Sequence, residues 1–314
     1  MPEWLVERGI GETRAVRVVN GETVEARIQL DGIVRAGTRL AARLKSVGPP
    51  PIAEAHGQEY LVPKGTSGIS EGAQLVIEVT REAIPGAEPW KRPLATVAQE
   101  SPGPPEPLDA EPLGFPAPVD RLAQAGWSDL LEEARSGIVR FPGGELRISP
   151  TPAMTLIDVD GHLPARELAL AGASAAARAI LRLDIGGSIG IDLPTAGSKA
   201  ARQDAAAAID ELLPQPFERT AVNGFGFIQI VRPRRRASIV ELARDRAAFE
   251  ARALLRRAAF EPAGPKRLVA HPAVIAVLQG RGEWVDELAR QVGGSIELRA
   301  DAALPMSGGY AETR

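Results

Sequence analysis

Two aspartates, each placed in a short apolar run, are the residues of this sequence best suited to chemistry. The first run spans residues 154 to 159 and carries Asp158, and the second spans 188 to 193 and carries Asp192. Runs this short, apolar and free of charge up to the aspartate are typical of buried strands in an α/β sheet. Carboxylates suit Mg²⁺, which takes only one or two of them from a protein. The pair therefore predicts a Mg²⁺ site if the fold brings the two runs together.

The segment between the two runs decides whether the aspartates meet. Residues 166 to 182 are rich in alanine and leucine, which predicts a helix crossing from the first strand to the second. A β-α-β unit of this kind makes its strands parallel and near neighbours. Adjacent strands lie about 4.8 Å apart. Asp158 and Asp192 are therefore expected side by side at the carboxyl ends of the strands, the edge of an open α/β sheet where ligands usually bind.

Cationic residues downstream of the second aspartate are candidates for contact with phosphate. A strand predicted at 225 to 231 leads into Arg232-Pro233-Arg234-Arg235-Arg236, and one long helix is expected over 238 to 260. A basic run is more often a solvated face. Its place after a strand of the aspartate domain nevertheless favours phosphate contacts by Arg232 and Arg234.

Other side chains in the chain offer less chemistry. A lone aspartate at a strand end is more often a cap or turn residue than a ligand, and it is the pairing of two that favours a metal site. The three histidines lack metal-ligand spacing and are more readily interpreted as surface or loop residues; they are His56, His162 and His271. His162, four residues past Asp158, is the one placed to approach the site. Neither a Gly-x-Ser-x-Gly elbow nor a Walker loop occurs, so serine hydrolase and nucleoside triphosphatase activities have no basis.

The N-terminal third of the sequence predicts β structure. Two alternating runs flank Asn20-Gly21, which is a strong hairpin signal. Further short strands between Gly and Pro clusters suggest a small barrel such as an OB-fold; they are expected at 39 to 47, 59 to 62, 74 to 81 and 94 to 97. Candidates for a face that stacks bases and contacts phosphate are Tyr60, His56, Trp90 and Lys91. Tyr60 and Trp90 also fit the plainer interpretation of ordinary barrel residues.

Composition bounds the classes of protein to which the chain can belong. Its 314 residues are 44% apolar and 25% charged, as in a globular protein of two or three domains. A net charge of −3 means that any binding of nucleic acid depends on local basic patches. The absence of cysteine excludes disulfides and thiolate zinc sites. No apolar run reaches 18 residues and the first residues lack the charged-then-apolar layout of a signal peptide, so a cytoplasmic protein without membrane contact is expected.

The motifs around the aspartates resemble the catalytic core of the ribonuclease E/G family of bacterial endoribonucleases. The core resemblance lies in Ile157-Asp158-Val159-Asp160-Gly161, in Leu181 to Gly187 and in Ile191-Asp192. Other segments resemble parts of that family in the same order. Residues 11 to 21 resemble the opening hairpin of its RNase H-like subdomain, and residues 70 to 79 with Lys91 resemble its RNA-binding OB-fold. Residues 137 to 140 resemble its 5′-phosphate sensing motif, residues 225 to 234 a strand with an arginine pair, and residues 274 to 310 its small terminal domain.

The resemblance implies a Mg²⁺-dependent endoribonuclease that cleaves single-stranded RNA. It implies an α+β multidomain fold: a small OB-fold barrel inserted in an RNase H-like remnant, then a deoxyribonuclease-I-like α/β catalytic domain and a small α+β C-terminal domain. The boundaries expected are 1–36 for the N-terminal hairpin, 37–98 for the barrel, 99–120 for a mobile Pro-rich linker, 121–150 for a shortened sensor segment, 151–262 for the catalytic domain and 263–314 for the C-terminal domain.

The resemblance also assigns roles to individual residues. Asp158 and Asp192 would hold the metal, and Arg219 would stabilise charge on the phosphate. The residues that would bind RNA are Tyr60, Lys91, Arg140, Arg232 and Arg234.

The sequence departs from the family pattern at informative places. Pro152 stands where the family has a glutamate, Asp160 where it has an asparagine, and Phe141 where it has a threonine in the sensing motif. Asp160 is therefore an additional catalytic candidate: its carboxylate either takes over the charge of the missing glutamate or only adds repulsion. The family's zinc link needs cysteines, so no zinc is expected and any oligomer forms without it. These departures keep open an alternative function, an RNA-binding protein with weak or no nuclease activity.

Overall fold

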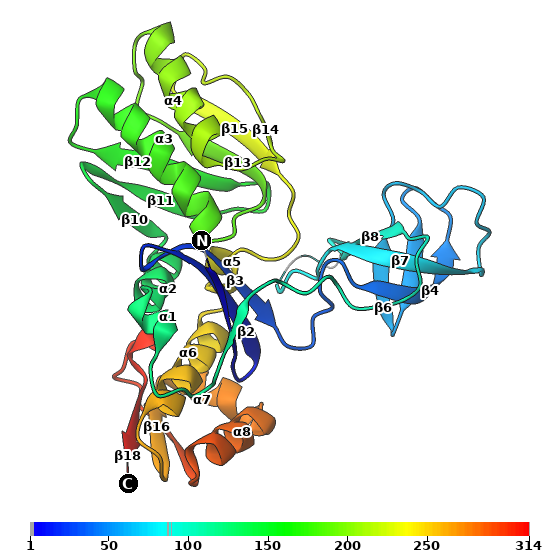
Figure 1. The fold of residues 1–314 in the computed structure, drawn as a ribbon, viewed down its shortest axis with the longest axis vertical. Helices are drawn as coiled ribbons and strands as arrows, with labels where there is room; N and C mark the ends of the chain where they lie inside the picture. Colours follow the sequence, from blue (N-terminus) through cyan, green and yellow to red (C-terminus); the bar gives the residue numbers. More distant parts are fainter. Residues whose placement is uncertain (1–2, 87, 89, 314) are drawn as a thin grey trace. The chain divides into compact units, whose positions relative to one another are not determined.

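The computed structural model describes residues 3 to 86, 88 and 90 to 313 of the chain, which is a mixed α+β protein as expected (Figure 1). The chain divides into two compact units. The first combines the residues up to Asp31 with Ala110–Val231 and Ser238 onward, and the second combines Gly32–Asp109 with Arg232–Ala237. Within the described residues, no helix is both long and apolar enough to cross a membrane.

A six-stranded sheet positions the aspartates in the first unit. Its strand order is β10 (Ile138–Phe141), β11 (Gly144–Pro150), β12 (Thr155–Gly161), β13 (Gly187–Asp192), β15 (Phe227–Arg232) and β14 (Glu218–Arg219). β12 and β13 are parallel neighbours, joined by helix α3 (Ala165–Arg182). The predicted β-α-β unit is therefore confirmed. Helix α4 (Lys199–Leu212) follows β13 and packs on α3.

One face of this sheet is covered by α3 and α4, as Figure 1 shows. Ile157, Val159 and Ile191 are buried on that face. A Cβ on Gly172 of α3 would collide with the side chain of Val159, so this glycine lets the helix lie close to the sheet. Because side chains alternate along a strand, the residues between the buried ones point to the opposite face, which is exposed.

A second sheet of the first unit has the order β3 (Glu22–Leu30), β2 (Glu12–Val19), β1 (Glu3–Arg8) and β9 (Glu111–Leu113). The predicted hairpin turn is confirmed, with positive φ at Asn20 and Gly21. β9 lies in the segment expected to be a mobile linker. That expectation was wrong for residues 111 to 113, because they pair in parallel with β1.

The predicted helix over 238 to 260 is interrupted. Ser238 and Glu241 form a capping box at the start of α5 (Ile239–Leu242), and Asp245 caps a second helix, α6 (Arg246–Phe260). The residues after the expected linker form two helices, α1 (Arg121–Gln124) and α2 (Trp127–Ser136), and Gly126 adopts a left-handed conformation between them.

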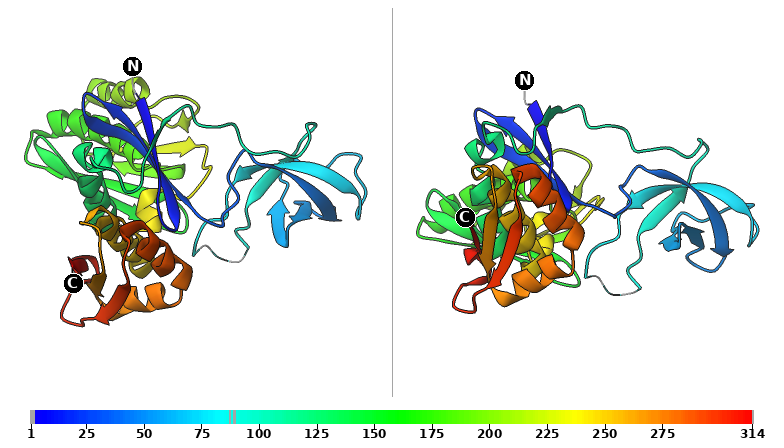
Figure 2. Two further views of the ribbon diagram at one scale, coloured as in Figure 1. Left: turned by 60° about the horizontal axis from the view of Figure 1, so that its bottom comes forward. Right: turned by 90° about the horizontal axis from the view of Figure 1, so that it is seen from below.

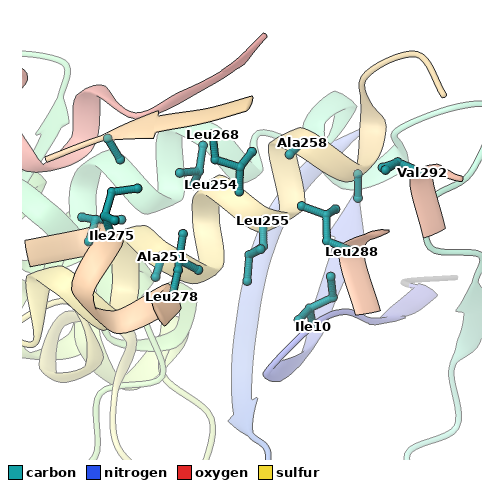
Figure 3. Close-up of a cluster of buried hydrophobic side chains, with 13 residues drawn as sticks. Ile10, Ala251, Leu254, Leu255, Ala258, Leu268, Ile275, Leu278, Leu288 and Val292 are labelled. Atoms are coloured by element: carbon teal, nitrogen blue, oxygen red, sulfur yellow. The ribbon is translucent and has the colours of Figure 1, made fainter. Parts of the chain in front are cut away.

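The C-terminal residues share their core with α6. They form the sheet β17 (Ile296–Ala300), β16 (Lys266–Ala270) and β18 (Tyr310–Thr313), with α7 (Pro272–Gln279), α8 (Gly282–Val292) and the short 3-10 helix η1 (Met306–Gly308). Figure 2 shows these orange to red elements gathered together. Leu254 and Leu255 of α6 pack with Leu268, Leu288 and Ile10 in one buried cluster (Figure 3). The predicted boundary at residue 263 therefore does not separate two hydrophobic cores.

The second unit contains a closed five-stranded barrel. Its strands are β4 (Arg39–Ser46), β5 (Ile52–Ala55), β6 (Gln58–Leu61), β8 (Leu94–Val97) and β7 (Gln74–Arg81). The small barrel expected from the sequence is confirmed, and β5 is a strand that the sequence did not predict. Ala53, Tyr60, Val62 and Ile77 fill its interior.

Candidate metal and nucleic-acid site

Asp158 and Asp192 are direct neighbours across β12 and β13. The two residues are register partners in the parallel pair, and both lie on the exposed face of the sheet. The expectation that the crossover places them side by side is confirmed. The cause is local: the buried isoleucines Ile157 and Ile191 are also register partners, which points both aspartates away from the helices.

Three further charged residues share this exposed face. Asp160 lies two residues beyond Asp158 on β12, and Arg147 and Glu145 lie opposite these two on β11. Arg147 approaches Glu145 at 2.9 Å and Asp160 at 3.7 Å. Sequence reasoning missed Arg147. The alternation of apolar and polar residues from Glu145 to Ile148 was the available signal.

The carboxylates on this face repel one another. Partial burial raises the pKa of Asp158 above its usual range, and the charges of Asp160 and Asp192 raise it further, while Arg147 opposes the shift. Neutralisation of this excess negative charge by a cation would relieve the repulsion.

The donor set fits Mg²⁺. No group of three or more His, Asp or Glu side chains within the described part of the chain is arranged to hold a metal ion. Asp158 and Asp192 nevertheless supply two carboxylates on an open face, and Mg²⁺ is commonly held by one or two carboxylates with water at its other positions.

Pro152, which stands where the ribonuclease E/G family has a glutamate, brings no carboxylate to this site. Pro152 is exposed in a turn closed by a hydrogen bond from the Thr151 backbone NH to the Met154 carbonyl. Asp160 is therefore the third aspartate on this face, beside Asp158 and Asp192.

The structure places Arg219 on the other face of the sheet, so its predicted role beside the aspartates was wrong. Its register partner on β15 is Ile230, which is fully buried on the helix-covered face. The Arg219 guanidinium forms a two-pronged ion pair with Asp210 of α4, including a 2.7 Å bond from Nε. This pairing lowers the pKa of Asp210. Arg219 is thus engaged as a structural ion pair.

The basic run begins at Arg232, the last residue of β15, and continues into the barrel unit. Residues 232 to 237 fall in the second unit, where the Arg235 carbonyl accepts a hydrogen bond from the Glu82 backbone NH at 2.8 Å. Arg236 lies 3.6 Å from the Glu82 carboxylate. Arg234 lies near Arg81, whose pKa is lowered by burial and by the charge of Arg234. The phosphate contacts of Arg232 and Arg234 stay predictions: Arg234 lies in the barrel unit, whereas Arg232 is also the last residue of β15 in the sheet of the aspartates.

Of the barrel residues predicted to contact RNA, Tyr60 is excluded by burial. Its side chain is 1% exposed in the barrel interior, which raises the pKa of its hydroxyl, and no ring face is open for stacking. Trp90 is instead 70% exposed. Lys91 beside it forms an ion pair with Glu88 at 3.0 Å. His56 adopts a positive φ in the turn between β5 and β6.

A pocket of about 400 Å³ adjoins the carboxylate face at the end of β12. It is lined by Arg140, Phe141, Glu145, Asp160 and His162, together with Gly143, Gly144 and Gly161. The prediction that His162 approaches the aspartates is supported to this extent, since it shares the pocket with Asp160. Arg140 on β10 is exposed at the same pocket.

Comparison with known proteins adds no relationship to this geometry. No protein-family model matches the chain, and no curated protein matches it. The functional assignment therefore rests on the residues and on their arrangement.

Proposed function

We propose that the protein is a Mg²⁺-dependent endoribonuclease that cleaves single-stranded RNA. The observation that carries the proposal is the register pairing of Asp158 with Asp192 on an open sheet face, where burial and then the charges of Asp160 and Asp192 raise the pKa of Asp158. Carboxylates held so close together that the pKa of one is raised are typical of functional sites. The motif resemblance to the ribonuclease E/G family adds the substrate class.

In this proposal each residue of the face has a separate task. Asp158 and Asp192 hold Mg²⁺, which would orient a water molecule and neutralise charge developing on the scissile phosphate. Asp160 lies within the same carboxylate set and is placed to accept a proton. Arg147, rather than Arg219, supplies a guanidinium beside the carboxylates and is placed to bind a phosphate oxygen.

The barrel unit supplies the RNA-binding surface in this proposal. An OB-fold assignment accounts for a closed five-stranded barrel with an exposed aromatic and nearby cations. Trp90 would stack on a base, and Lys91, Arg81 and Arg234 would contact the backbone. The RNase H-like and deoxyribonuclease-I-like assignments of the first unit belong to the same proposal and rest on the sequence motifs.

A second candidate function is RNA binding with weak or no cleavage. It is favoured by Pro152, which removes one carboxylate, and by the engagement of Arg219 with Asp210. Phe141 further replaces a polar side chain at the pocket of Arg140.

Cleavage of a 5′-labelled single-stranded RNA, with Mg²⁺ and with EDTA, distinguishes the two functions. The wild-type chain should cleave only with Mg²⁺, and Asp192→Asn should not cleave. Asp286→Asn is the matched control, since Asp286 is an exposed aspartate of α8. Tight RNA binding without cleavage by the wild-type chain would instead establish the second function.

A further inference from the structure

An apolar strip crosses the exposed sheet face next to the aspartates. Leu156 and Gly190 are register partners two residues before Asp158 and Asp192. A Cβ on Gly190 would lie 2.6 Å from Cζ of Phe227 and 3.1 Å from Cδ2 of Leu156. The side chains of Leu156 and Phe227 therefore both lie over Gly190 and form a small apolar floor there. Leu156 remains 39% exposed in that position.

Phe225 carries an exposed aromatic ring two residues before Phe227 in the chain. Its side chain is 84% exposed, the largest exposed fraction of any large apolar side chain in the described chain. Phe225 precedes Gly226, whose carbonyl accepts a hydrogen bond from the backbone NH of Leu193 at 3.2 Å. Leu193 directly follows Asp192. The ring is therefore anchored at the end of β13 that carries the second aspartate.

The turn that carries Phe225 is held by hydrogen bonds on both sides. The Asn223 side chain accepts from the backbone NH groups of Phe225 and Phe227 at 2.9 and 3.0 Å. The Thr195 hydroxyl donates to the Phe225 carbonyl at 3.1 Å. Gly226 has a φ of +99°, and a Cβ there would collide with the Leu193 carbonyl. The backbone that carries the ring is thus held in place, while the ring itself is left in water, which costs free energy unless a ligand covers it.

We propose that Phe225, with the floor formed by Leu156 and Phe227, is a nucleobase-stacking subsite that holds a base of single-stranded RNA beside the phosphate at the aspartates. This inference rests on the proposed function. The faces of a nucleobase are flat and apolar and can pack on the Phe225 ring and on the apolar floor. Each base is also joined to a phosphate, which Mg²⁺ at the two aspartates would bind. The patch is small and bordered by charge, which fits one base better than a protein surface.

The test is an affinity measurement in EDTA, where the nuclease is inactive. A fluorescent oligouridylate is compared with the same RNA carrying one abasic nucleotide, placed at each position in turn. Phe225→Ala should weaken binding of the intact RNA by roughly 5- to 150-fold, the range expected for loss of one stacked base. Phe225→Trp should retain it. Tyr310→Ala removes another exposed aromatic ring, on β18, and serves as the control.

The abasic series isolates the stacking contact. At one position the missing base should weaken binding to the wild-type chain and leave binding to Phe225→Ala nearly unchanged, because the two losses remove the same contact. Equal affinities of wild type and Phe225→Ala for every RNA would overturn the inference. A change of oligomeric state in Phe225→Ala without a change of RNA affinity would also overturn it, and would assign the ring to contacts between copies of the chain. If the wild-type chain does not cleave RNA but the stacking contact is measured, the stacking subsite is supported and only the proposed nuclease activity is refuted.

Discussion

The two faces of the six-stranded sheet use aspartate in opposite ways. On the helix-covered face, Asp210 is paired with Arg219 and its pKa is lowered. On the exposed face, Asp158 lies among carboxylates and its pKa is raised. In the first arrangement the charge of Asp210 is neutralised by Arg219, so neither side chain has an unpaired charge with which to bind a ligand. The second leaves negative charge that a cation can neutralise. An aspartate at a functional site is therefore distinguished by its unsatisfied charge rather than by its residue type.

The largest expected effect comes from removal of one charge on the exposed face. Asp158→Asn should abolish Mg²⁺-dependent cleavage, because one metal ligand is lost. The same change should raise the unfolding temperature in EDTA, because the repulsion by Asp160 and Asp192 disappears. Mg²⁺ should then raise the unfolding temperature of the wild-type chain and have little effect on Asp158→Asn. The measurements are the cleavage assay and thermal unfolding with and without Mg²⁺, with Asp286→Asn as the control. Cleavage retained in both Asp158→Asn and Asp192→Asn would refute the shared metal site.

The same substitution on each face gives the next test. Arg147→Ala should reduce the cleavage rate by about 10²-fold, the loss expected when one charge-stabilising donor is removed. Arg219→Ala should change the rate little and lower the free energy of unfolding by about 0 to 1 kcal/mol, because the Arg219 and Asp210 ion pair is partly exposed. Rates measured at saturating RNA, with denaturant unfolding of both variants, separate the two effects. A rate loss in Arg219→Ala alone would return the catalytic role to Arg219.

The barrel unit also has one buried and one exposed aromatic side chain, Tyr60 and Trp90. Trp90→Ala should weaken RNA affinity by roughly 5- to 150-fold if a base stacks on it. Tyr60→Phe keeps the buried ring and should leave RNA affinity unchanged. Fluorescence anisotropy in EDTA measures both. The opposite order of effects would mean that the barrel opens to expose Tyr60 when RNA binds.

The features that the sequence predicted are those set by long patterns. Two apolar runs joined by an alanine-rich helix sufficed to place Asp158 beside Asp192, because the handedness and pairing of a β-α-β unit leave little choice. The hairpin at Asn20-Gly21 was predictable because its turn requires positive φ at both residues.

The features that the sequence did not predict depend on the direction of side chains in short elements. β14 has only two residues, too few for an alternation that would show which face Arg219 occupies. β6 has four residues, and Tyr60 points inward because of the barrel's register. The attachment of the basic run to the barrel unit was not predicted because its partner, Glu82, lies in a different part of the sequence. Phe225 was missed because its exposure arises from the hydrogen bonds of Asn223 in a turn.

The smallest expected effect is a shift in pH dependence on the exposed face. Because the pKa of Asp158 is raised in the folded chain, its carboxylate takes up a proton at a higher pH than an ordinary aspartate, for which the value is about 4. The unfavourable charge of Asp158 is present above this raised pKa and is relieved as the pH falls through it. Mg²⁺ affinity should fall over the same interval, since the protonated carboxyl is a poor ligand.

Asp160→Asn sharpens this test, because the charge of Asp160 contributes to the raised pKa. The variant should move the protonation of Asp158 to lower pH, followed through the ¹³C chemical shift of its carboxyl carbon in the absence of metal. Asp210 should titrate below the ordinary range in both proteins, since Arg219 lowers its pKa, and it provides the internal reference on the other face. An Asp158 titration that Asp160→Asn leaves in place would show that the charge of Asp160 does not contribute to the raised pKa. Burial and Asp192 would then be its remaining causes, and the coupling on the exposed face would be limited to the Asp158 and Asp192 pair.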